Sequence, residues 1–128
     1  MPERGPEAVR EREQRPEGEE EVLWEGRPSI VAGIDSRTTR YRITNRRIQV
    51  IHSGLRSRTE EIPLSQVQGV TVYQSLTDQT AGVGDVIVSI GGGEKVILEE
   101  LHEYQQVAEI IRQAVREQAG AVSRSLSG

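Results

Sequence analysis

The sequence contains no cysteine and no phenylalanine, and its aromatic residues are limited to one tryptophan and three tyrosines. Without cysteine the chain has no disulfide bond, no thiol nucleophile and no thiolate metal site, which is typical of a reducing compartment. Because aromatic residues are so few, the hydrophobic core has to be built from valine, isoleucine and leucine. That composition favours β-strands.

Long apolar runs are also missing. No stretch approaches the roughly 20 consecutive apolar residues of a membrane-spanning helix, and the N-terminus lacks the pattern of a signal peptide. We therefore expect a cytoplasmic protein with no transmembrane segment, for which peripheral association with the inner face of the membrane stays open.

No group of residues in the sequence is typical of catalysis. The only histidines, His52 and His102, lack partners at the spacing of a zinc motif. The GVGDV stretch at residues 82–86 precedes a predicted strand instead of opening a helix, which argues against a phosphate-binding loop. We therefore expect a protein that is not an enzyme and that uses no cofactor and no metal ion.

The two ends of the 128-residue chain are poor in large apolar side chains. Residues 1–20 are charged and interrupted by proline, so they cannot bury enough surface to offset the entropy of ordering, and we expect a disordered acidic tail. Residues 119–128 are small and polar and are expected to form a flexible tail. One domain, residues 21–118, lies between them.

Between the tails, seven β-like runs alternate with turn signals at residues 21–29, 39–44, 46–52, 55–63, 69–75, 84–90 and 94–100. None of the connections is long enough to hold a helix, so the strands are expected to be antiparallel. Three consecutive glycines, residues 91–93, predict a hairpin turn.

The last ordered stretch has the period of a helix. Its apolar stripe consists of Tyr104, Val107, Ala108, Ile111, Ala114 and Val115. Gly120 is expected to end this helix. Seven strands followed by one helix predict a mainly β fold, a small bent sheet or partly open barrel whose open end the helix covers.

Positive charge is concentrated in one stretch of an otherwise acidic chain. Residues 37–58 contain seven arginines and no acidic residue, whereas the whole chain has a net charge of −4. Two explanations stay open. The stretch forms either a binding face for anions or the solvated face of a sheet, which has to be polar in any case.

The alternation of side chains predicts how two strands of this stretch pair. A two-residue turn at residues 45–46 places Ile43 opposite Ile48. It also places Tyr41 opposite Val50, so that the apolar partners lie on one side and the polar partners on the other.

A second turn, at Ser53 and Gly54, would extend the pattern to a third strand and place Gln49 beside Arg58. The alternation breaks near Glu61, where we expect a bulge or the end of the strand. The outer face would then carry five candidate anion-binding residues, Arg40, Arg42, Arg47, Arg56 and Arg58.

The best candidate ligand for that face is an anionic membrane surface, where each basic residue adds about 1 kcal/mol. Nucleic acid is disfavoured because the chain is acidic and Tyr41, the only aromatic residue in the stretch, is expected to point inward. The tail at residues 1–20 either competes with outside anions for the face or serves solubility. The alternative function is protein binding or self-assembly through an exposed strand edge.

Several motifs occur in an order that resembles a known family. They are VLWEGRPS at residues 22–29, YRITNRR at 41–47, EIPL at 61–64, Gln74 with Ser75, and GVGD at 82–85. Together they are similar to bacterial pleckstrin homology (PH)-like domains of the YdbS type, over about residues 21–117. The resemblance implies two packed antiparallel sheets of seven strands capped by a C-terminal helix, in a non-catalytic module common in membrane-associated proteins. It supplies no ligand-binding residues. This chain has only IVAGIDSRTTR where many relatives carry apolar membrane segments.

Overall fold

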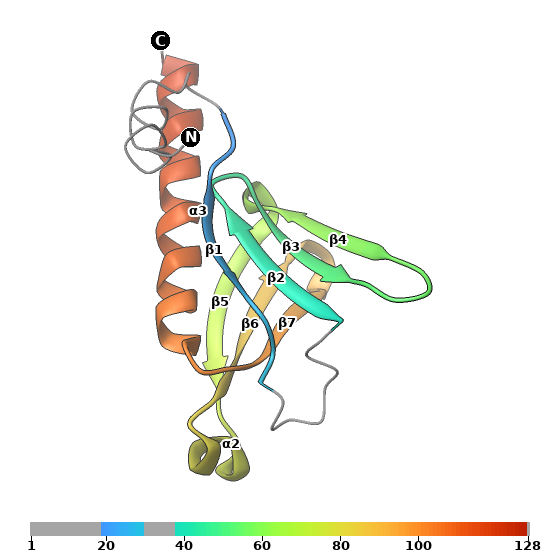
Figure 1. The fold of residues 1–128 in the computed structure, drawn as a ribbon. Coiled ribbons are helices and arrows are strands. Elements are labelled where there is room, and N and C mark those ends of the chain that lie inside the picture. The colour runs from blue at the N-terminus through green and yellow to red at the C-terminus, as the bar shows by residue number, and fades with distance from the viewer. Residues whose placement is uncertain (1–18, 30–37, 128) are drawn as a thin grey trace, which may run out of the picture.

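The computed structural model describes residues 19–29 and 38–127, with side chains as far as residue 122. Within these ranges seven antiparallel strands form two sheets, followed by one long helix (Figure 1). The first sheet has the order β1 (Val22–Gly26), β2 (Thr39–Thr44), β3 (Arg47–His52), β4 (Arg58–Pro63). The second has the order β5 (Val67–Tyr73), β6 (Gly84–Ile90), β7 (Lys95–Leu101). The helix α3 spans Tyr104–Ser127. The predicted mainly β fold with a C-terminal helix is confirmed.

The core lies between the sheets and beneath α3. Its largest buried members come from both sheets and from the helix, and include Ile43, Ile48, Ile62, Val86, Val88, Leu98, Val107 and Ile111. Full burial of such a side chain contributes about 1.5–3 kcal/mol. In Figure 1, α3 runs beside β1 and β5, which are edge strands of different sheets. The helix therefore covers the corner where the two sheets are not joined by hydrogen bonds.

The pairing of β2 with β3 agrees with the prediction from side-chain alternation. Ile43 lies opposite Ile48 and Tyr41 lies opposite Val50. All four side chains are buried, and Tyr41 points inward as expected. The register is determined locally, because a two-residue turn permits only one pairing that places all the apolar side chains on the same face of the sheet.

The predicted register of β3 with β4 is wrong. Gln49 lies opposite Glu61, three residues beyond the expected partner Arg58. An odd shift reverses the two faces of β4, so that Ile62 is buried and Glu61 is exposed. The connection has five residues instead of two, and this length lets Ile62 enter the core without the expected bulge.

A short helix that the sequence analysis excluded lies in the connection between β5 and β6. The helix α2 spans Leu76–Ala81. It begins with a capping box, in which the side chains of Ser75 and Asp78 each accept a hydrogen bond from the other residue's backbone N–H. Gly82, with φ of 73°, ends it in the left-handed conformation that glycine adopts without strain. The 3-10 turn η3 (Gly91–Gly93) joins β6 to β7, as the glycine run predicts.

Both predicted chain ends differ in part from the structure. The helix α3 continues through Gly120 to Ser127, so the expected helix end is wrong. Glycine in a helix interior costs only about 1 kcal/mol, which neighbouring residues can offset. Residues 1–18 of the predicted acidic tail lie outside the described residues, whereas Glu20 accepts a hydrogen bond of 2.8 Å from the Thr44 hydroxyl. The division of the chain into a tail at residues 1–20, a domain at 21–118 and a tail at 119–128 stays a prediction.

Candidate functional site

The five predicted arginines do not share one face. Arg40 and Arg42 on β2, and Arg47 on β3, occupy positions that alternate with buried ones and so lie on the outer face of the first sheet. Arg56 is in the connection after β3. Arg58 turns to the opposite face, which corrects the predicted arrangement, because the register of β4 is shifted by an odd number of residues.

The face reached by Arg58 is the hollow between the sheets. Arg58 lies directly across from His52, and both line a hollow of about 370 Å³ together with Tyr41 and Val50. Lys95 of β7 lines the same hollow from the second sheet.

Acidic side chains neutralise much of the outer face. The guanidinium of Arg42 lies 2.6 Å from the carboxylate of Glu25 on β1. The guanidinium of Arg47 lies 3.0 Å from Glu20 and 3.2 Å from Glu61. These pairs are partly exposed, so each contributes at most about 1 kcal/mol to stability. Their main effect is that the outer face carries mixed charge.

Less of the positive charge is available than the sequence suggests. Arg58 lies 3.3 Å from Glu60 on the same strand. Within the described ranges, Arg40 and Arg56 form no ion pair. Of the five predicted arginines, Arg40 on the sheet and Arg56 in the β3–β4 connection are therefore the two without an acidic partner among the described residues.

The β3–β4 connection, residues 53–57, forms the end of a hairpin that projects from the body of the molecule (Figure 1). We call it the hairpin tip. Its Leu55 is fully exposed, at 106% of the reference area, and Arg56 follows it. Single exposed apolar residues are common on proteins. Leu55 differs from these because it lies at the end of a projecting hairpin and is followed by the cationic Arg56.

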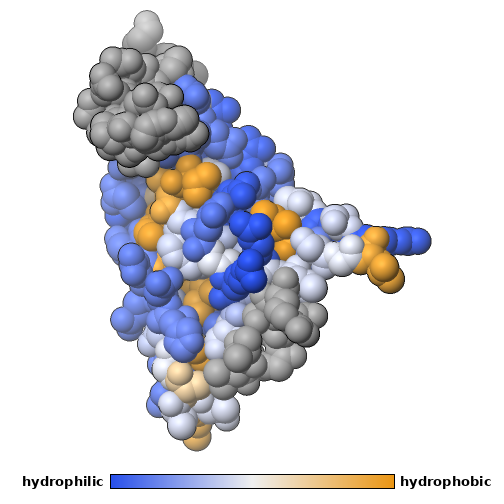
Figure 2. Space-filling view, in the orientation of Figure 1, coloured by the Kyte–Doolittle hydropathy of each residue, from blue (hydrophilic) through white to orange (hydrophobic). Residues whose placement is uncertain are grey.

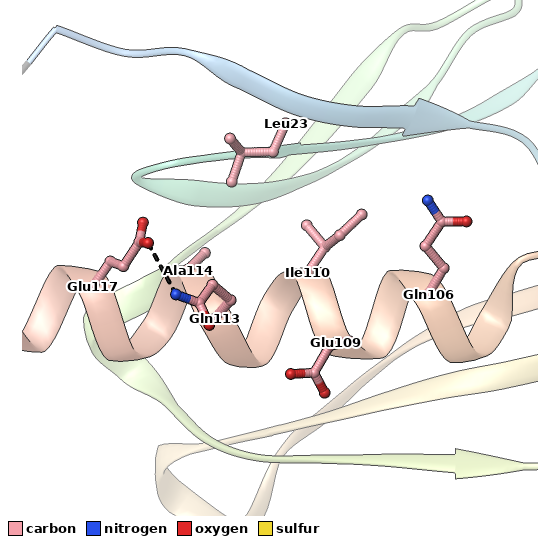
Figure 3. Close-up of a pocket in the computed structure, with 7 residues that line it drawn as sticks. All are labelled: Leu23, Gln106, Glu109, Ile110, Gln113, Ala114 and Glu117. Carbon is pink, nitrogen blue, oxygen red and sulfur yellow. Dashed lines mark hydrogen bonds between the residues drawn. The ribbon is translucent and has the colours of Figure 1, made fainter.

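A groove of about 650 Å³ lies between β1 and α3. We call it the helix groove. In Figure 3, Leu23 of β1 faces Ile110 and Ala114 of α3 across the groove. Figure 2 shows apolar side chains gathered beside α3. Polar side chains complete the lining: Gln106, Glu109, Gln113 and Glu117.

One signal in the sequence points to the helix groove. Ile110 is the one large apolar residue of the predicted helix that falls outside its stripe. The structure adds that the neighbouring Val22 and Leu23 of β1 are both exposed, which leaves apolar surface beside the helix. The pairing of the two elements could not be predicted, because about 80 residues separate them.

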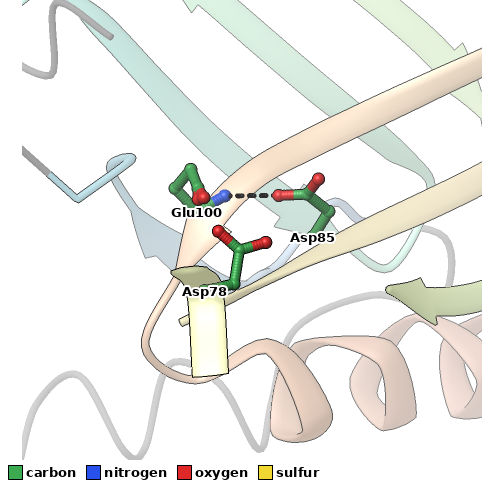
Figure 4. Close-up of side chains that lie close together, drawn as sticks. All are labelled: Asp78, Asp85 and Glu100. Carbon is green, nitrogen blue, oxygen red and sulfur yellow. Dashed lines mark hydrogen bonds between the residues drawn. The ribbon is translucent and has the colours of Figure 1, made fainter. Parts of the chain in front are cut away.

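Three carboxylates from three elements converge at one end of the second sheet (Figure 4). They belong to Asp78 on α2, Asp85 on β6 and Glu100 on β7, and one oxygen of each lies within 4.8 Å of the others. Asp78 and Glu100 are almost fully buried. We call these residues the acid cluster.

Backbone hydrogen bonds orient two members of the acid cluster. The Glu100 N–H donates to Oδ1 of Asp85 at 2.9 Å, and the Ser75 N–H donates to Oδ2 of Asp78 at 3.1 Å. Glu100 has a left-handed backbone with φ of 57°, which is unusual for a residue other than glycine. Its Oε2 is buried and has no hydrogen-bond partner.

Proximity of the carboxyl groups shifts their protonation in opposite directions. A hydrogen bond to Asp78, together with burial, raises the pKa of Glu100 to about 7. Hydrogen bonds from Glu100 and from the Ser75 backbone lower the pKa of Asp78. Near neutral pH the two groups therefore share one proton, because two adjacent buried carboxylates repel each other.

Seven antiparallel strands in two packed sheets, with a C-terminal helix over the open corner, define a PH-like domain. The model of the family described as bacterial PH domain matches residues 23–117, and the chain belongs to this family. It is also similar to the crystal structure of a DUF1696 family protein with a pleckstrin-homology domain from Shewanella loihica PV-4. The identity is 14%, the match covers 88% of this chain and 90% of that one, and the TM-score is 0.55. At that identity the likeness shows the fold alone.

A comparison with curated proteins finds no match. PH-like domains are generally non-catalytic, and membership of the family suggests a binding module. Among the described residues, none of the helices has the length and apolar character needed to cross a membrane.

Proposed function

We propose that this PH-like domain is a protein-interaction module that binds a second copy of itself, with the hairpin tip of one copy in the helix groove of the next. The observation that carries the proposal is the complementarity of two exposed surfaces on one molecule. The tip presents a fully exposed leucine, Leu55. The groove presents an apolar floor of Leu23, Ile110 and Ala114.

The energetics of this contact are favourable at both its centre and its rim. Burying Leu55 contributes about 1.5–3 kcal/mol. The cationic Arg56 follows the leucine, while Glu117 borders the groove together with Glu109, which is already paired with Arg112 and Arg116. Opposite charges at a rim orient the partner and speed association more than they add affinity.

The positions of tip and groove favour association between copies. In Figure 1 the hairpin tip points away from α3, on the other side of the molecule. The tip therefore contacts the groove of a neighbour and leaves its own groove free, a head-to-tail arrangement.

The test is the molar mass of the protein across a range of concentrations, measured by light scattering on a size-exclusion column. We expect the mass to rise with concentration. Leu55→Ser and Leu23→Ser should each abolish the rise, because each removes one half of the contact. Leu76→Ser is the matched control, since Leu76 is an exposed leucine on α2 outside both surfaces.

Mixing the two variants distinguishes this contact from a general loss of solubility or folding. The Leu55→Ser protein keeps an intact groove and the Leu23→Ser protein keeps an intact tip. Together they should form a one-to-one complex that grows no further. If the mixture stays monomeric, or if Leu76→Ser also abolishes association, the proposed contact is wrong.

A second candidate function is association with an anionic membrane surface, by a YdbS-type domain at the inner face of the membrane. It is supported by Leu55 beside Arg56, and by the lack of an acidic partner for Arg40 and Arg56 within the described residues. The anion-binding role of Arg40, Arg42, Arg47, Arg56 and Arg58 stays a prediction. Each available arginine adds about 1 kcal/mol, which with one leucine gives only weak, reversible binding.

Liposome flotation separates the two candidates. Association with vesicles of anionic lipid that weakens with salt, and is absent with neutral lipid, would favour the membrane. Glu substitutions of Arg40 and Arg56 should then abolish flotation. Absence of flotation together with concentration-dependent mass would favour self-association.

A further inference from the structure

We propose that the acid cluster, Asp78, Asp85 and Glu100, forms a site for a hard divalent cation, with calcium as the preferred ion. This site does not depend on the proposed self-association. The three side chains come from α2, β6 and β7, so that only folding brings them together. Their spacing in the sequence matches no metal motif, which explains why sequence analysis predicts no metal.

The geometry fits a single ion. One oxygen from each carboxylate lies within 4.8 Å of the other two. Calcium–oxygen distances are about 2.3–2.6 Å, so oxygens on opposite sides of one calcium ion lie about 5 Å apart. All three carboxylates can therefore reach the same ion.

The second observation is a buried oxygen to which no N–H or hydroxyl group donates, Oε2 of Glu100. Only 9% of the residue is exposed, and its carboxyl group is hydrogen-bonded to Asp78, inside the cluster. Buried carboxylate oxygens in proteins are ordinarily hydrogen-bonded or bound to a metal, because an unpaired one loses its hydration without compensation. In Figure 4 the Glu100 carboxyl group lies beside that of Asp78, within the cluster.

The neighbouring hydrogen bonds prepare the other two ligands. The backbone N–H groups of Ser75 and Glu100 each engage an oxygen of Asp78 and Asp85 respectively, which fixes those carboxylates. No basic side chain in the described ranges forms an ion pair with the cluster. A cation would supply the missing positive charge.

The choice of ion follows from the donor set. Carboxylate oxygens suit hard cations such as calcium, magnesium and manganese. Calcium tolerates irregular geometry, whereas magnesium requires a nearly ideal octahedron and retains most of its water. Three carboxylates held by a helix and two strands impose no octahedron, and Asp85 is only half-buried, which leaves room for water ligands.

The test is calorimetric titration of the full chain, freed of metal by a chelator, with CaCl₂ and then with MgCl₂ at constant ionic strength. We expect one calcium ion per chain and weaker binding of magnesium. Glu100→Gln and Asp85→Asn keep the size of each side chain and should weaken calcium binding at least tenfold. Circular dichroism checks that the variants fold. If one of them does not, the other is sufficient for the test.

The matched control is Glu99→Gln, which changes an exposed acid on the adjacent position of β7. It should lower calcium affinity far less than Glu100→Gln does, because the Glu99 charge acts on the cluster only weakly. Absence of saturable calcium binding below roughly 1 mM, the weak end of protein calcium sites, would overturn the proposal. Equal loss of affinity in Glu99→Gln and Glu100→Gln would also overturn it, because calcium would then be attracted by the general negative charge of the region. Tighter binding of magnesium than of calcium would overturn the assignment of calcium.

Discussion

At the scale of single residues, Glu100 combines three unfavourable features. It is buried, its backbone is left-handed, and its side chain faces two other acids. A left-handed backbone outside glycine costs about 1–2 kcal/mol. Strained backbone conformations and shifted pKa values both cluster at functional sites.

The raised pKa of Glu100 predicts how stability changes with pH in the absence of metal. Its pKa is about 7 in the folded chain, compared with 4.5 ordinarily. The folded state therefore holds a proton that the unfolded state releases, so the free energy of unfolding should fall as pH rises from about 4.5 to about 7. The pKa of Asp78 is lowered instead, so Asp78 changes the free energy of unfolding only at lower pH.

Urea unfolding at a series of pH values, with chelator present, measures this dependence. Glu100→Gln carries no titratable proton and should flatten the fall between pH 4.5 and 7. Glu99→Gln serves again as the control and should reduce the slope only slightly, because the Glu99 charge is the smallest of the causes that raise the pKa of Glu100. A Glu100→Gln protein with the full wild-type slope would show that another group is responsible.

At the scale of elements, one close approach joins β6 to the beginning of α3. A Cβ atom on Gly84 would lie 2.9 Å from Cγ of the Tyr104 ring and 3.0 Å from Cγ of Gln74. The strand can pass beneath the tyrosine only because this position has no side chain. The same strand carries Asp85, so this contact also positions the acid cluster.

Gly84→Ala should therefore lower the free energy of unfolding by about 1–3 kcal/mol, the usual cost of overpacking a core. Gly69→Ala is the matched control, because no atom lies within 4 Å of the Cβ it would introduce. Chemical unfolding of both variants measures the difference. Equal stability of the two would contradict the close packing of β6 against α3.

At the scale of the whole molecule, a hairpin tip and a helix groove on opposite sides make association directional. A symmetric dimer uses the same surface on both partners and stops at two copies. A head-to-tail contact leaves one tip and one groove free until the assembly closes into a ring.

The mass distribution should therefore extend beyond dimer as concentration rises. Sedimentation velocity measures it directly. High salt should weaken the assembly, because it screens the arginine–glutamate rim, without abolishing the leucine contact. A distribution that ends at dimer under all conditions would exclude the head-to-tail arrangement.

Local patterns were sufficient for much of this fold. The alternation around Ile43 and Ile48 determined both the β2–β3 register and the inward face, because a two-residue turn leaves a single pairing that buries the apolar side. The stripe on α3 was equally local, since Val107 and Ile111 lie one turn apart. Family motifs then indicated how these pieces combine.

The candidate sites depended on contacts between distant parts of the chain. Alternation alone does not determine the register of β4, because the register also depends on the length of the β3–β4 connection, which is set by the burial of Ile62 in the core. The exception is α2, because Ser75 and Asp78 have the sequence spacing of a capping box, which is a local signal for the start of a helix.

By itself, the sequence determined the number and order of strands, the final helix and the excess of arginine between residues 37 and 58. Only the tertiary structure decided that Glu25 and Glu61 neutralise part of that charge, that Leu23 faces Ile110 across a groove, and that three acids converge. The physical reason is that periodicity records which side of an element is buried. It does not record which distant element buries it, and the binding surfaces of this protein lie where such elements meet.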